Sequence, residues 1–127
     1  MKLAGALLAT LALAGPTQKQ PEWILLGTRA VNDRVDHDVI PVTAARGDWQ
    51  ALKITVQRAS VDFYRVVVHF GNGTQQEVQM RNTIPAGGET RAIDLTGADR
   101  VINRVEFWYD ANTIRGRRAI VHLFGRR

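Results

Sequence analysis

The sequence predicts a single-domain, all-β protein: an antiparallel β-sandwich of about eight strands, with a closed or partly open β-barrel as the alternative. Beyond residue 22, nearly every segment alternates apolar and polar residues or runs through β-branched residues. No segment keeps an apolar period of about 3.6 residues for three turns, and turn residues interrupt the chain roughly every 8 to 12 residues. A chain of 127 residues has room for one hydrophobic core.

The first four strands are expected at residues 23–31, 39–42, 52–56 and 61–70. The first and fourth are rich in β-branched and aromatic residues. Pro41 favours a sheet edge for the second strand, because proline donates no ladder hydrogen bond. The third alternates Leu52, Ile54 and Val56 with polar residues, which indicates one face in the core and one in water.

The last four strands are expected at residues 74–80, 91–95, 100–109 and 118–124. Gly71-Asn72-Gly73 predicts a tight hairpin between the fourth and fifth strands. Residues 84–88, with proline and two glycines, predict a loop before the sixth strand. The seventh strand alternates Val105, Phe107 and Tyr109 with polar residues, so these three are expected to face the core.

Residues 1–14 predict a secretory signal peptide. Met1-Lys2 precedes an apolar run of leucine and alanine, and Ala12-Leu13-Ala14 forms a small-x-small cleavage site. An apolar run of about a dozen residues is shorter than the roughly 20 that span a bilayer, so no transmembrane segment is expected in the mature chain. Residues 15–22 are then a flexible leader and residues 23–127 the sandwich domain. We expect a protein exported to the periplasm or the extracellular space.

The chain is basic, with a formal net charge of +5, and three of its 17 basic residues are lysine, which leaves 14 arginines. Arginine pairs bidentately with carboxylate and phosphate groups and stacks on aromatic rings. Export weighs against nucleic acid and favours an anionic polymer of the cell envelope as the partner, although the charge can also serve solubility alone. Without cysteine, disulfides and thiolate chemistry are excluded. The candidates for an anionic surface are Arg115, Arg117, Arg118, Arg126 and Arg127.

The order of several turn and strand residues resembles that of a family of small exported bacterial proteins of unknown function. The residues that carry the resemblance lie between Leu25 and Gly125 and are Asp36-x-Asp38-x-Ile40-x-Val42, Gly47-x-Trp49, Val66, Val68, Phe70, Asn72-Gly73, Ile93-Asp94-Leu95-x-Gly97, Arg100-x-Ile102, Arg104-Val105 and Ala119-x-Val121-x-Leu123-x-Gly125. The resemblance implies an exported β-sandwich and brings no activity or catalytic residues with it.

Asp33, Asp36 and Asp38 are candidate metal ligands, and Ca²⁺ is the one cofactor that the sequence brings into consideration. The three carboxylates and His37 lie in a turn-prone stretch, and Ca²⁺ takes oxygen ligands from such loops. The stretch lacks the glycine and the distal glutamate of an EF-hand loop. The alternative is that these aspartates cap turns and pair with arginines.

No catalytic residue is predicted. Ser60 is the only serine, and it lacks the Gly-x-Ser-x-Gly surroundings of a nucleophile elbow. His37, His69 and His122 are the available general bases. A hydrolase without a recognised motif therefore stays open only as a second alternative.

The last two strands supply the candidate ligand-binding residues. If these strands pair antiparallel with Phe107 opposite Val121, their outward residues gather on one sheet face. Aromatic rings beside a guanidinium and a carboxylate–imidazole pair form a surface suited to a sugar or an anionic polymer. The alternative is that the N-terminal segment around Trp23 or residues 110–117 cover this face. The candidates are Arg104, Glu106, Trp108, His122 and Phe124.

Together these observations favour a non-catalytic binding or interaction module of the bacterial cell envelope, with a carbohydrate or an anionic polymer as its ligand. The first alternative is a structural or assembly protein that docks another protein through an exposed strand face.

Overall fold

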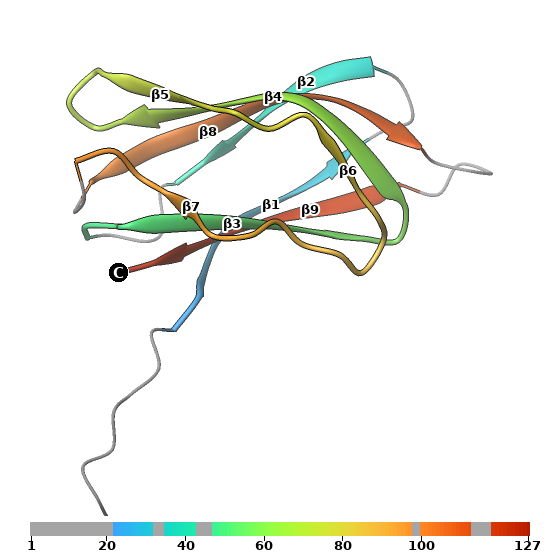
Figure 1. Ribbon diagram of the computed structural model, residues 1–127, viewed down its shortest axis with the longest axis horizontal. Coiled ribbons are helices and arrows are strands. Elements are labelled where there is room, and N and C mark those ends of the chain that lie inside the picture. The colour runs from blue at the N-terminus through green and yellow to red at the C-terminus, as the bar shows by residue number, and fades with distance from the viewer. Residues whose placement is uncertain (1–21, 32–34, 43–46, 98–99, 113–117) are drawn as a thin grey trace, which may run out of the picture.

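A computed structural model describes residues 22–31, 35–42, 47–97, 100–112 and 118–127. Two antiparallel sheets pack face to face (Figure 1). We name them after their central strands. The β9 sheet has the order β1 (Ile24–Val31), β9 (Ala119–Arg126), β3 (Ala51–Gln57), β7 (Ile93–Asp94). The β8 sheet has the order β2 (Val35–Pro41), β8 (Ile102–Asn112), β4 (Ser60–Phe70), β5 (Gln75–Val78), and β6 (Asn82–Ile84) also pairs with β4.

The sandwich prediction is confirmed, since neither of the two sheets in the described residues closes on itself. This part of the chain contains no helix, and so none that is long and apolar enough to cross a membrane. The predicted hairpin joins β4 to β5, where the Phe70 N–H donates to the Thr74 carbonyl at 2.9 Å and Gly73 has a φ of +91°. Pro41 lies on an edge strand, as expected.

The structure departs from the prediction in β2 and β6, and it shows an irregularity in β4. β2 begins at Val35, so Asp36 to Asp38, which were expected in a loop, lie in a strand. β6 was not expected at all. In β4 the pairing with β8 shifts between Phe63 and Arg65. This irregularity turns Tyr64 outward, 42% exposed, and leaves Phe63 in the core.

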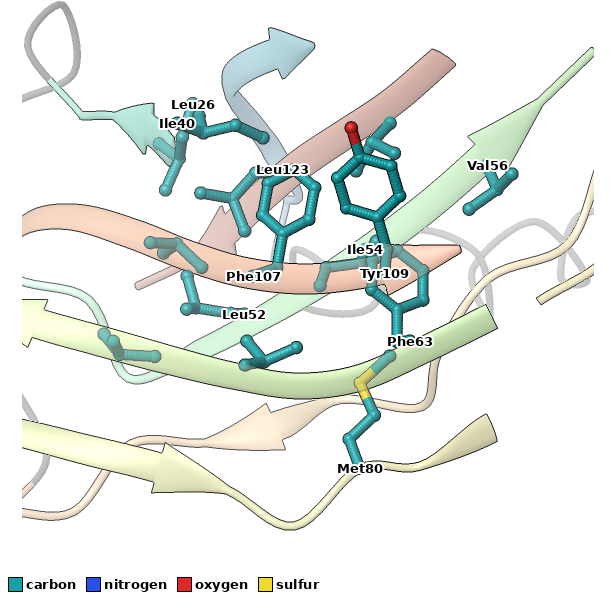
Figure 2. Packing of buried hydrophobic residues seen from close by; sticks show 14 of the residues in the cluster. Leu26, Ile40, Leu52, Ile54, Val56, Phe63, Met80, Phe107, Tyr109 and Leu123 are labelled. Atoms are coloured by element: carbon teal, nitrogen blue, oxygen red, sulfur yellow. The ribbon is translucent and has the colours of Figure 1, made fainter. Parts of the chain in front are cut away.

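The core lies between the two sheets and is filled by their inward residues (Figure 2). Phe107 is at its centre, with its ring centroid 5.9 Å from that of Phe63 and 5.5 Å from that of Tyr109. A Cβ added at Gly125 would lie 2.8 Å from a ring carbon of the buried Trp49, so the indole needs a glycine at this position of β9.

One predicted pairing is wrong. β8 pairs with β2 and β4, whereas β9 pairs with β1 and β3, so the last two strands lie in different sheets. Phe107 and Val121 both face the core, as predicted, but they do so from opposite sheets. The outward residues of β8 and of β9 consequently lie on opposite outer faces of the sandwich.

Two outer faces as candidate functional sites

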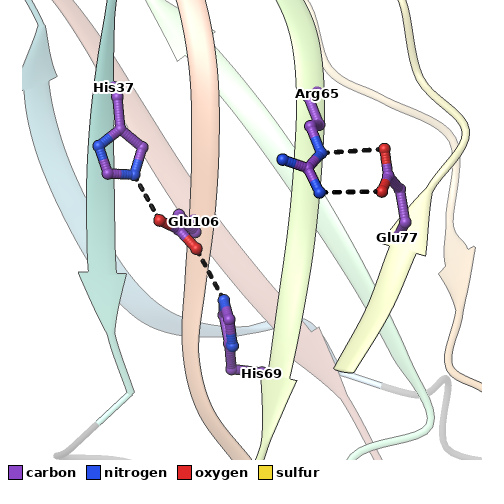
Figure 3. A network of polar contacts seen from close by, with 5 residues as sticks. All are labelled: His37, Arg65, His69, Glu77 and Glu106. Carbon is purple, nitrogen blue, oxygen red and sulfur yellow. Dashed lines mark hydrogen bonds and ion pairs between the residues drawn. The ribbon is translucent and has the colours of Figure 1, made fainter. Parts of the chain in front are cut away.

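The outer face of the β8 sheet carries a polar network that joins three strands. Glu106 lies on β8 between two imidazoles: its Oε2 is 2.5 Å from His37 Nε2 on β2, and its Oε1 is 2.8 Å from His69 Nε2 on β4 (Figure 3). The hydrogen bond from His69 lowers the pKa of the Glu106 carboxyl, and the hydrogen bond from His37 and the two nearby imidazoles lower it further against the opposing effect of burial. The carboxylate thus holds β2, β8 and β4 together at one point.

Trp108 on the same face stands between two flat groups. His37 stacks on its indole at a centroid distance of 4.7 Å, and the Arg65 guanidinium lies 4.6 Å from the ring centroid. The two partners come from β2 and β4, on either side of β8. Arg65 in turn makes a bidentate pair with Glu77, at 3.0 and 3.2 Å (Figure 3). The indole is therefore packed within a row of side chains and does not form the open platform that the sequence led us to expect.

The outer face of the β9 sheet combines aromatic, cationic and hydroxyl groups. Outward residues pair in rows across β1, β9 and β3, with Leu25, Phe124 and Lys53 in one row and Thr28, His122 and Thr55 in the next. Trp23 precedes β1 and lies beside the first row, where Lys53 is close to both aromatic rings. We call this surface the β9 outer face; it consists of Trp23, Leu25, Thr28, Lys53, Thr55, His122, Phe124 and Arg126.

Two cations lie over one aromatic ring on this face. Lys53 Nζ is 4.6 Å and Arg126 Cζ is 4.7 Å from the ring centroid of Trp23. Lys53 also pairs with Glu89 at 3.4 Å, whereas Arg126 has no carboxylate partner among the described residues. Cation–π contacts hold a guanidinium in place but leave its charge uncompensated. Arg126 is thus a positioned positive charge on a sheet face.

Polar and apolar groups continue the surface away from the two cations. Thr28 Oγ1 and His122 Nδ1 are 3.0 Å apart, and Leu25 is 51% exposed. Hydroxyl and imidazole groups that are only partly surrounded can hydrogen-bond a second partner. The β9 outer face therefore offers contacts for apolar, hydroxyl and anionic groups at the same time.

Comparison with known proteins identifies the family. The model of the family described as Domain of unknown function (DUF2541) matches residues 5–125. The chain belongs to this family. The expected resemblance to a family of unknown function is thereby confirmed. No curated protein matches the chain.

A solved structure supports the fold. The structure of AlgX from Pseudomonas aeruginosa is similar to this chain, with a TM-score of 0.53 and 16% sequence identity over 80% of this chain. The match covers 26% of the AlgX chain, so the similarity extends over about a quarter of that protein. At this level of identity the likeness concerns the arrangement of the strands.

The five predicted ligand-binding residues are divided between the two faces. Arg104, Glu106 and Trp108 lie on the β8 sheet, and His122 and Phe124 on the β9 sheet. The wrong β8–β9 pairing is the reason. Sequence reasoning missed Lys53 as a member of the β9 outer face, although its alternation with Leu52 and Ile54 already placed it outward.

The predicted basic cluster is spread along β9. Arg118 immediately precedes the strand, and Arg126 ends it. Eight residues of strand separate them by about 26 Å. The Arg127 guanidinium lies 4.3 Å from the ring centroid of Trp49. Arg115 and Arg117 lie outside the described residues, so three arginines of the five can be placed, and they do not gather at one point.

The candidate metal ligands Asp36 and Asp38 have protein partners. Asp36 Oδ1 accepts the backbone N–H of His37 at 2.8 Å. Asp38 accepts Arg29 Nε at 3.0 Å and the buried Tyr109 hydroxyl at 2.8 Å, which ties β1 to the β8 sheet. Asp33 lies outside the described residues. Within the described ranges, no three His, Asp or Glu side chains are grouped so as to hold a metal ion.

A groove of about 800 Å³ lies between β5 and residues 89–94. It is on the side of the sandwich away from β1 and β2. Val78, Met80 and Ile93 line it together with the carboxylates of Glu77, Glu89 and Asp94. Glu106, whose carboxyl pKa is shifted, lies on the sheet face and does not line this groove.

Proposed function

We propose that this chain is a non-catalytic binding module of the bacterial cell envelope that holds an anionic polysaccharide on the β9 outer face. The observation that carries the proposal is the position of Arg126. Its guanidinium is fixed over Trp23 beside Phe124, on the outer face of the β9 sheet, without a carboxylate partner among the described residues. The signal peptide predicted at residues 1–14 supports the assignment to the envelope.

The chemistry of the β9 outer face suits an acidic sugar chain. Partly buried aromatic rings can pack against the C–H faces of a sugar, and Trp23 and Phe124 are both partly buried. A guanidinium binds a carboxylate through charge-assisted, bidentate hydrogen bonds. Thr28, Thr55 and His122 add donors and acceptors for sugar hydroxyls. The β8 sheet suits such a ligand less well, because its carboxylates and cations pair with one another.

The proposal is tested by fluorescence titration of the mature chain, residues 15–127, with hyaluronan as the anionic probe and dextran as the neutral one. A Trp108→Phe background removes the indole of the β8 sheet, so that the signal comes from Trp23 and the buried Trp49. We expect saturable binding of hyaluronan. Arg126→Gln should weaken it by at least about tenfold, since a hydrogen bond to a charged group contributes roughly 1.5 to 3 kcal/mol.

Arg104→Gln is the matched control, because it removes one arginine from the outward side of β8 and should leave binding unchanged. A loss of binding in Arg104→Gln but not in Arg126→Gln would show that the ligand binds the β8 sheet, and it would contradict the proposed site. Absence of binding to hyaluronan and to dextran would reject the proposed function.

A further inference from the structure

We infer that the ligand of the β9 outer face is a sparsely charged linear polysaccharide that lies lengthwise along β9, with one acidic group at Arg126 and another at Arg118. This inference rests on the proposed function and specifies its ligand.

The lengthwise direction follows from the alternation of β9. Ala119, Val121, Leu123 and Gly125 are buried, while every intervening residue from Ile120 to Arg126 is partly exposed. β9 is the strand between β1 and β3, so its outward residues form the midline of the face. From Ile120 to Arg126 this midline measures about 20 Å. A chain molecule that follows it contacts apolar, imidazole, aromatic and guanidinium groups in turn.

The low charge density of the ligand follows from where the cations lie. Lys53 and Arg126 are at one end of the face, and Arg118 lies beyond the other end. The rows between them contain Thr28, His122 and Thr55, and then Ala30, Ile120 and Gln57. A densely charged polymer would place anionic groups over these rows, which hold no lysine, arginine or carboxylate.

Glu89 strengthens the same argument. Its carboxylate pairs with Lys53 at the edge of the face, and the backbone of Glu89 bridges to Thr55 on β3. A polymer with closely spaced anionic groups would meet this carboxylate as well as the neutral rows. Like charges at short range oppose binding. An acidic group on only some of the sugar units avoids both costs.

The test compares ligands of different charge density and length against single arginine variants. Hyaluronan, with a carboxylate on every second sugar, should bind more tightly than heparin, which is densely sulfated. The logarithm of its affinity should fall with the logarithm of salt concentration with a slope of only about −1 to −2, since one or two ion pairs form.

Arg118→Gln should weaken long hyaluronan chains about threefold to tenfold and leave oligosaccharides shorter than about 20 Å unaffected. Arg126→Gln should weaken both. Arg81→Gln, which removes an exposed arginine immediately before β6, is the control for net charge and should change neither.

The outcomes separate the two proposals. Tighter binding of heparin than of hyaluronan, or equal effects of Arg118→Gln on short and long chains, would overturn this inference and leave the proposed function standing. Absence of binding to all of these polymers would reject the proposed function itself.

Discussion

Replacing Glu106 with glutamine tests whether the three-strand network stabilises the β8 sheet through its charge. The carboxylate accepts one hydrogen bond from His37 and one from His69. Glutamine offers one oxygen and one NH₂ group, so it keeps one acceptor, loses the charge and presents a donor to the other imidazole. A hydrogen bond to a charged group contributes roughly 1.5 to 3 kcal/mol when buried. Because Glu106 is 21% exposed, we expect a loss of about 1 to 2 kcal/mol near pH 7.

The pH dependence gives the result that would refute this reasoning. The pKa of Glu106 is lowered from its ordinary value of 4.5, so the carboxylate stabilises the fold above that value and this contribution is lost as the pH falls through the lowered pKa. Urea unfolding, followed by circular dichroism, should show a clear difference between wild type and Glu106→Gln near pH 7, and this difference should shrink as the pH falls through the lowered pKa of Glu106. A difference that stays the same at a pH low enough to protonate the Glu106 carboxyl of the folded protein would show that the carboxylate charge is not its cause.

Glu77→Gln is the matched control for this experiment. It also removes a carboxylate from the β8 sheet, but one that is 48% exposed and pairs with a single arginine. Exposed ion pairs contribute about 0 to 1 kcal/mol, so this variant should cost less than Glu106→Gln. An equal loss in both variants would mean that the two imidazoles add nothing to a surface ion pair.

Three further predictions concern the frame around the two faces. Tyr109→Phe removes the hydroxyl that donates to Asp38 and should lower the free energy of unfolding by about 1 kcal/mol, measured as a lower urea midpoint at an unchanged m-value. Gly27→Ala should cost about 1 to 3 kcal/mol in the same assay, because the added Cβ would overlap Ile40 Cγ2. Calorimetric titration with Ca²⁺ should give no heat at millimolar metal, since Asp38 is engaged by protein donors; a saturable signal abolished by Asp36→Asn would contradict this expectation.

The alternation of apolar and polar residues predicted which side chains face the core. Val105, Phe107 and Tyr109 are buried, and so are Val121 and Leu123, because successive residues of a strand point to opposite faces wherever the strand lies. The same local rule placed Glu106, Trp108, His122 and Phe124 outward. This information is contained in each strand by itself and needs no knowledge of its neighbours.

Strand partners could not be predicted in the same way. Alternation does not depend on which strand lies alongside, so it gave no warning that β8 and β9 belong to different sheets. The β4 irregularity was hidden for a related reason. The sequence alone allows either Phe63 or Tyr64 to point into the core. Only the irregular pairing of β4 with β8 decides that Phe63 is the one that does.

The candidate site could not be predicted either, because it also depends on which strands lie side by side. The contact of Lys53 and Arg126 with Trp23 joins the start of the domain, its middle and its end. No motif spans such distances along the chain. Two parts could have been found from the sequence: the outward position of Lys53 on β3 and that of Arg126 on β9.

The shortness of the strands at one side of the sandwich bears on how the protein behaves at high concentration. β7 spans two residues and β5 four, and the Gln76 side chain bonds across from β5 to the backbone of Asp94 and Thr96. A long, flat edge strand is a template on which another chain can add its own strand. Here the template is two to four residues long and partly occupied by a side chain. We therefore expect this side of the sandwich, where β5 and β7 are the edge strands, to resist pairing with a strand of another molecule.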